Sequence, residues 1–123
     1  MRAYTFRRRE RLKSEIQIKE LFSKGSSFNL YPFRVIHRVF STENSDHKVL
    51  FSVPARNFKK AVDRNKLKRR AREAYRLHKG TLNKKPALIL GFVYSAKKIE
   101  PFSAIQTSVV QIIDKLNGSD VSK

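Results

Sequence analysis

Hydrophobic residues along the chain follow two different spacings, which predict helices and strands in alternation. Three segments have apolar residues three and four positions apart, the spacing of an amphipathic helix; they are 14–24, 60–78 and 102–116. Three others have the alternating or short apolar patterns of strands; they are 32–40, 49–53 and 86–94. This order predicts an α+β or mixed α/β domain in which helices pack against one sheet.

The strand patterns also predict how the strands are exposed and paired. In 32–40, alternation places Phe33, Val35, His37 and Val39 on one face and Arg34, Ile36, Arg38 and Phe40 on the other. The polar stretch 41–48 indicates a turn, so we expect a hairpin between 32–40 and 49–53. The run 86–94 is almost entirely apolar, as in a strand that is buried on both faces.

The predicted helix 60–78 carries apolar and basic residues on neighbouring sides. With about 100° between residues, one side collects the apolar residues and should face the sheet: Leu67, Ala71, Ala74, Tyr75 and His78. The adjacent stripe is basic, with Arg64 at its edge: Asn65, Lys68, Arg69, Arg72 and Arg76. Further round the helix lie Lys66, Arg70 and Glu73.

Positive charge is concentrated on and just before this helix. The chain has 28 Lys and Arg against 10 Asp and Glu, a formal charge of +18, and residues 56–79 contribute half of it. Like charges one helical turn apart, such as Arg64 and Lys68, destabilise a bare helix. A phosphate backbone reverses that penalty and releases its counterions, so a nucleic-acid partner is favoured over a merely solvated charged face. Asn65 could contact such a partner, or it could cap the helix or make a local bond to the backbone.

Composition excludes several other classes of protein. The chain has 123 residues, which predicts one domain, 1–123, with a basic arm at 1–12 and a frayed tail at 117–123. It contains no cysteine, no secretory signal pattern and no apolar stretch long enough to span a bilayer, so we expect a cytoplasmic protein. The acids are scattered and the three histidines lack ligand spacing, which predicts no catalytic and no metal site in the polypeptide.

The segment "FSVPARNFKKAVDRNKLKRRAREAYR", 51–76, resembles the protein subunit of bacterial ribonuclease P. That family has an Arg-Asn-Arg motif, a Lys-Arg pair and a further Arg, which read here as Arg64-Asn65-Lys66, Lys68-Arg69 and Arg72. The third motif position is Lys, which keeps the charge but loses the planar donor fork of Arg. Flanking residues also match, including Val53-Pro54, Arg56-Asn57, Arg11-Leu12 and Phe22, whereas Ile18 replaces a common phenylalanine and Lys59 stands where some members have glycine.

The resemblance implies a more specific fold than the patterns alone. It implies an α+β, two-layer α/β sandwich with three helices on a four-stranded mixed sheet, in the order α-β-β-β-α-β-α. The additional strand would come from residues 26–30. The basic helix would lie in a left-handed crossover between parallel strands, although such connections are right-handed in most proteins.

The resemblance also implies a function in tRNA maturation. The family cuts the 5′ leader from precursor tRNA, and its catalyst is an RNA subunit with Mg2+ held mainly by that RNA and the substrate. The implied partners are therefore the RNA subunit and precursor tRNA, with no membrane and no obligate protein partner. We assign binding of the RNA subunit to Arg64, Asn65, Lys66, Lys68, Arg69, Arg72 and Arg76.

Two further groups of residues are candidates for contacting substrate. Single-stranded RNA is held by stacking surfaces beside basic side chains, and the first helix and the sheet could supply both for the leader. The leader candidates are Ile18, Phe22, Phe33, Val35, His37, Arg34 and Arg38. Additional phosphate contacts could come from Arg7, Arg8, Arg9, Arg11, Lys13, Arg56, Lys59 and Lys60. Core packing is the alternative for Phe22 and Phe33, a structural role for His37, and a solubilising tail for the arm.

Three other functions share some of these features. A structural RNA-binding protein of ribosomal type would have similar charge and size but no effect on tRNA cleavage. A DNA-binding module would prefer duplex DNA and show base-dependent losses on mutation. A helix bound to an anionic membrane needs a broad exposed apolar face, whereas the apolar side of 60–78 is better explained by contact with the sheet.

Overall fold

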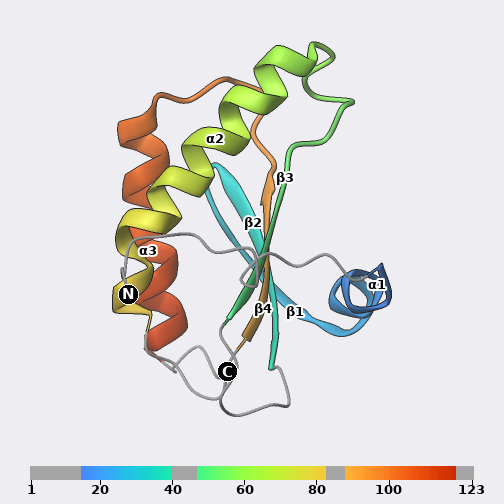
Figure 1. The fold of residues 1–123 in the computed structure, drawn as a ribbon, viewed down its shortest axis with the longest axis vertical. Coiled ribbons are helices and arrows are strands. Elements are labelled where there is room, and N and C mark those ends of the chain that lie inside the picture. Colours follow the sequence, from blue (N-terminus) through green and yellow to red (C-terminus); the bar gives the residue numbers. More distant parts are fainter. Residues whose placement is uncertain (1–14, 40–46, 83–87, 119–123) are drawn as a thin grey trace.

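The computed structural model describes residues 15–39, 47–82 and 88–118 (Figure 1). Its elements are α1 (Glu15–Lys24), β1 (Ser26–Leu30), β2 (Phe33–Val39), β3 (Lys48–Ser52), α2 (Ala61–His78), the short 3-10 helix η2 (Lys79–Thr81), β4 (Leu88–Tyr94) and α3 (Phe102–Asn117). This α+β order confirms the predicted fold class, including the strand at 26–30. The predictions for Phe40, for the arm with Arg7, Arg8, Arg9, Arg11 and Lys13, and for 119–123 lie outside the described residues.

The strands form one mixed sheet in the order β1-β2-β4-β3. β2 is antiparallel to both β1 and β4, and β3 is parallel to β4. The predicted hairpin between 32–40 and 49–53 is therefore wrong, because β4 lies between these strands. β4 is buried along nearly its whole length, and an apolar strand of this kind is best accommodated in the middle of a sheet. The connection from β3 through α2 to β4 is the parallel crossover that the resemblance implies.

Helices cover the two faces of the sheet unequally. α2 and α3 lie together on one face, and α1 lies alone on the other (Figure 1). The main core fills the space between the sheet and the α2–α3 layer; it includes Phe33, Val35, Phe92, Leu67 and Ile112. A second, smaller cluster lies under α1 and is built on Leu21, Ile36 and Ile89. α1 thus partly covers the face of the sheet opposite the one that α2 and α3 cover.

Two glycines allow α1 to approach the sheet closely. A Cβ on Gly25 would lie 2.5 Å from Leu21 O and 3.0 Å from His37 O, both of them backbone atoms. A Cβ on Gly91, in β4, would lie 3.2 Å from Leu21 Cδ2. Because Leu21 is completely buried, these contacts fix where α1 sits.

Candidate nucleic-acid interface

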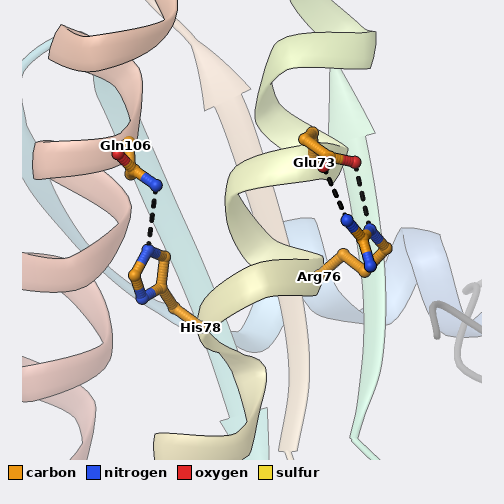
Figure 2. Close-up of polar contacts among 4 residues, drawn as sticks. All are labelled: Glu73, Arg76, His78 and Gln106. Atoms are coloured by element: carbon orange, nitrogen blue, oxygen red, sulfur yellow. Dashed lines mark hydrogen bonds and ion pairs between the residues drawn. The ribbon is translucent and has the colours of Figure 1, made fainter. Parts of the chain in front are cut away.

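α2 presents its basic residues because its other side is anchored in the core. Leu67, Ala71, Ala74 and Tyr75 are buried, which confirms most of the predicted apolar stripe. At the end of the helix, Gln106 Nε2 of α3 lies 3.1 Å from His78 Nε2 (Figure 2). The apolar contacts and this polar contact together fix the rotation of α2 about its axis, and so decide which residues face away from the sheet.

Asn65 lies inside the helix rather than at its start. Lys60 is the N-cap residue of α2 and makes no side-chain capping bond. Asn65 is therefore in the second turn, and its side chain is exposed. This position rules out the capping role and leaves its amide available to a partner.

Five side chains of α2 form what we call the open stripe. They make no side-chain hydrogen bond or ion pair with any residue in the part of the chain that the structure describes. Its members are Asn65, Lys66, Lys68, Arg69 and Arg72. Asn65, Arg69 and Arg72 are exposed, and the two lysines are half-buried. The open stripe thus offers four cations and one amide without internal partners among the described residues.

Three other arginines of the same helix are held by the protein itself. Arg64 Nη1 donates to Phe58 O at 2.8 Å and to Lys59 O at 2.9 Å. Arg70 Nη1 donates to Glu100 O at 2.6 Å, which joins α2 to the segment between β4 and α3. Sequence spacing could not separate these arginines from the open stripe. The acceptors of Arg64 and Arg70 lie outside the helix, and the pairing of Arg76 depends on the side-chain conformation that it adopts.

Arg76 is held by an acid on its own helix. Its Nε and Nη2 donate to Glu73 Oε1 at 3.0 Å and to Glu73 Oε2 at 2.7 Å (Figure 2). These hydrogen bonds lower the pKa of Glu73 below its ordinary value and raise that of Arg76. An RNA phosphate that binds Arg76 must therefore compete with a carboxylate that stays ionised at neutral pH.

The loop before α2 adds more basic residues to the same end of the molecule. Arg56, Lys59 and Lys60 are exposed there. The loop closes with a turn in which Asn57 N donates to Pro54 O at 3.2 Å. Arg64 ties Lys59 O to the first turns of the helix, so the loop is fixed although it lacks the glycine that some relatives have.

A second candidate surface lies on the α1 side of the sheet. β2 places Arg34 and Arg38 on the same face as Ile36, which belongs to the cluster under α1. α1 supplies Ile18, packed against that cluster, and Phe22, whose surface is 46% exposed. We call this surface the leader face, with the members Ile18, Phe22, Arg34 and Arg38. It brings together four of the seven residues predicted to contact the leader.

The remaining three leader candidates point to the opposite face. Phe33 and Val35 are 2% and 0% exposed in the main core, and the Phe33 ring packs edge-on against Phe92 and Tyr94. His37 contacts the Phe28 ring, with centroids 5.8 Å apart, on the same side of the sheet. Core packing, the alternative for Phe33, is therefore confirmed. Val35 is buried in the same core, and neither residue has surface left for a base. The predicted alternation along β2 is confirmed, and it places these three residues on the face that α2 and α3 cover, with Arg34 and Arg38 on the other face.

One polar residue of the leader face was not predicted. Glu20 of α1 accepts a hydrogen bond from Arg38 Nη1 at 3.2 Å. A contact between residues 18 positions apart depends on how α1 docks, so no local pattern could have indicated it.

Two further kinds of feature were looked for in the described residues: groups of metal-ligating side chains and helices able to cross a membrane. No three His, Asp or Glu side chains within 15–39, 47–82 and 88–118 gather into a group that could hold a metal. In the same ranges, no helix combines the length and apolar character needed to cross a bilayer.

Comparison with known proteins identifies the family. The sequence model of the family described as Ribonuclease P matches residues 6–117. The chain belongs to the ribonuclease P protein family. The ribonuclease P protein component of Porphyromonas gingivalis is 31% identical over 120 residues, covering 89% of this chain and 85% of the relative. Ribonuclease P is an endoribonuclease of tRNA processing, and the members of this family are its protein subunit.

Solved structures of the ribonuclease P protein agree with the fold. The protein from Staphylococcus aureus superposes with a TM-score of 0.71 at 27% identity, covering 87% of this chain and 96% of that one. The protein from Thermotoga maritima superposes with a TM-score of 0.74, covering 87% and 97%, and at 24% identity it supports the fold alone. The motif of Arg64, Asn65 and Lys66, which resembles that of the ribonuclease P family, lies on α2, where the open stripe begins.

Proposed function

We propose that this ribonuclease P protein binds the catalytic RNA subunit through the open stripe of α2 and the 5′ leader of precursor tRNA through the leader face. The observation that carries the first part is the division of the basic side chains on one helix. Arg64, Arg70 and Arg76 have internal acceptors, whereas the open stripe has none among the described residues. Charges left close together without acceptors are favourable only where a polyanion neutralises them.

The chemistry of the open stripe suits the backbone of a folded RNA. Arg69 and Arg72 offer planar guanidinium groups that can donate two parallel hydrogen bonds to a phosphate. Lys66 and Lys68 act as compact charges that need less exact geometry. Asn65 can donate to a phosphate or ribose, or pair with a base edge, and so adds a contact that depends less on salt.

The leader face suits a flexible single strand. Phe22 is a half-exposed ring on which a base can stack, and stacking of this kind contributes about 1–3 kcal/mol per base. Arg34 is exposed on the neighbouring strand and can contact the adjoining phosphate. Ile18 offers an apolar contact but no ring, so we assign it a weaker part than its aromatic counterparts in the family.

The cleavage chemistry belongs to the RNA subunit in this proposal. Bound Mg2+ would supply activation of water and stabilisation of the leaving oxygen. The polypeptide positions the substrate and screens charge between two polyanions, which lowers the Mg2+ concentration needed for cleavage.

The decisive experiment is cleavage of precursor tRNA by a bacterial ribonuclease P RNA at limiting Mg2+. The reaction is run with and without this protein. One substrate has a leader long enough to reach the leader face, and the other has a leader too short to reach it. We expect rescue by the protein, larger for the substrate whose leader reaches the leader face. Tight binding to the RNA subunit without rescue would favour a structural RNA-binding protein of ribosomal type.

Two substitutions on α1 separate the leader role from the fold. Phe22→Ala should weaken binding of leader-bearing substrate and leave leaderless tRNA unchanged. Ile16→Ala is the matched control, because Ile16 is 70% exposed on the same helix and is not a member of the leader face. Equal losses for both substrates in a folded Phe22→Ala variant would count against the leader role.

A further inference from the structure

An ion pair joins α1 to the sheet within the leader face. Arg38 Nη1, on β2, donates to Glu20 Oε1, on α1, at 3.2 Å. The side chains are 35% and 46% exposed, so water and ions reach both groups. An exposed pair of this kind contributes little to stability, and Arg38 can exchange its acceptor at small cost.

A phosphate and a carboxylate are rival acceptors for the same guanidinium. Both present anionic oxygens that match its donor fork. A leader phosphate that approaches Arg38 must therefore displace Glu20, and it is also repelled by the charge of Glu20. Arg34 lies four positions before Arg38 on the same face of β2 and has no acceptor among the described residues. The leader face thus contains one shielded and one unshielded arginine.

We propose that Glu20 is a specificity-determining residue: it is a counter-ion that a leader phosphate displaces from Arg38, and its charge lowers the affinity of the leader face for RNA that is not correctly placed. This inference rests on the proposed leader role. RNA that contacts Phe22 and Ile18 as well as Arg38 gains enough to overcome the competition. RNA that offers phosphates alone does not, which matters for a chain with a formal charge of +18.

A second ion pair provides a matched control on a different surface. Glu73 and Arg76 of α2 form a carboxylate–guanidinium pair with side-chain exposures of 46% and 36%, nearly equal to those of Glu20 and Arg38. This pair borders the open stripe instead of the leader face. Neutralising Glu73 should therefore change binding to the RNA subunit and should not distinguish leader-bearing from leaderless tRNA.

The test measures binding of leader-bearing and leaderless tRNA by the holoenzyme, assembled from this protein and a ribonuclease P RNA. The variants are Glu20→Gln, Arg38→Gln, the double variant and Glu73→Gln. Glutamine at position 20 keeps an oxygen that can accept from Arg38 and removes only the charge. We expect Glu20→Gln to bind leader-bearing tRNA about threefold more tightly, the effect of removing one like charge about 6 Å away in a water-like dielectric. For this variant, the slope of log K against log salt, with K the binding constant for leader-bearing tRNA, should steepen by about 0.7.

The other variants give the remaining expected results. Arg38→Gln should weaken leader binding, and the gain from Glu20→Gln should be smaller in the double variant, because without Arg38 no guanidinium holds a phosphate close to position 20. Glu73→Gln should change both substrates by the same factor. If the pair served only to dock α1, Glu20→Gln and Arg38→Gln would both weaken leader binding, so the opposite signs decide between these roles even where stability changes.

Two outcomes would overturn the inference, and they differ in what else they affect. Unchanged or weaker leader binding by Glu20→Gln, in a wild type that prefers leader-bearing tRNA, overturns the role of Glu20 alone. Equal binding of the two substrates by the wild type overturns the leader role and this inference with it.

Discussion

Arg64 offers a sharp test of the division between the open stripe and the internally held arginines. The family motif begins at Arg64, which by resemblance alone would be a phosphate contact. In the structure its Nη1 donates to Phe58 O and Lys59 O at 2.8 and 2.9 Å. We therefore expect Arg64→Ala to loosen the loop before α2 as well as to weaken RNA binding.

The size of the effect follows from these two hydrogen bonds. Hydrogen bonds from a charged donor contribute about 1.5–3 kcal/mol when well formed. One of these lies at an exposed carbonyl, so solvent replaces much of it, and we expect a total loss of about 1–2 kcal/mol. For a chain of this size, that loss lowers Tm by about 3–8 °C. Arg64→Lys should recover part of it, because lysine keeps the charge but cannot reach both carbonyls equally well.

Thermal unfolding followed by circular dichroism measures this loss, and Arg69→Ala is the control. Arg69 is exposed and has no internal partner among the described residues, so its removal should change the unfolding free energy by less than about 0.5 kcal/mol. Arg69→Ala should instead flatten the dependence of log K on log salt for the RNA subunit by about 0.7–0.9. An Arg64→Ala variant that unfolds like the wild type and flattens the salt dependence by a full contact would refute the structural role.

Packing and protonation lead to three more expected outcomes. Gly25→Ala would place Cβ 2.5 Å from Leu21 O, so urea unfolding should show a loss of about 1–3 kcal/mol; a neutral result would mean that α1 is not fixed at this point. Phe33→Ala should cost about 3–5 kcal/mol, far more than Phe22→Ala, and equal losses would contradict the assignment of the two faces. Burial raises the pKa of Tyr94, whose hydroxyl donates to Lys98 O. The stability that comes from its neutral form is present below the ordinary tyrosine pKa of about 10 and is lost as pH rises from there through the raised pKa. Tyr94→Phe should therefore lose less stability than the wild type above about pH 10. Identical profiles of stability against pH would show that Tyr94 does not contribute to the alkaline loss of stability.

The sequence predicted the features that depend on local spacing. The buried side of α2, with Leu67, Ala71, Ala74 and Tyr75, follows from the helical period, which is set by residues within two turns. The alternation along β2 was likewise predicted, because it depends only on the geometry of a strand. The residue types of the site were indicated by charge density and by the motif that starts at Arg64.

Strand pairing and the open face required information that lies far along the chain. β2 and β3 are joined by a polar segment and looked like a hairpin, but β4 separates them, and it begins 49 positions after Val39. The continuous apolar run of β4 was the available sign that it belongs in the middle of the sheet. Which face of β2 is open depends on where α2 and α3 dock, and that is decided by packing of the whole domain.

Whether each basic side chain has a partner within the protein also could not be predicted. Arg64 and Arg70 donate to backbone carbonyl oxygens, which every residue has and which leave no trace in the sequence. Arg38 and Glu20 meet only because Leu21 packs over Gly91 and brings α1 onto the sheet. Composition therefore indicated a basic surface but could not show which of its cationic side chains already have acceptors within the protein.

The separation of the two hydrophobic clusters by the sheet has a consequence for how the molecule can change. α1 rests on Leu21, Ile36 and Ile89, whereas α2 is anchored in a different cluster on the far side. Substitutions that reshape the seat of α1 therefore leave the anchoring of α2 intact. Over evolutionary time, or in the laboratory, the first helix could be exchanged between relatives to alter the proposed leader face while the open stripe of α2, the proposed contact with the RNA subunit, keeps its position.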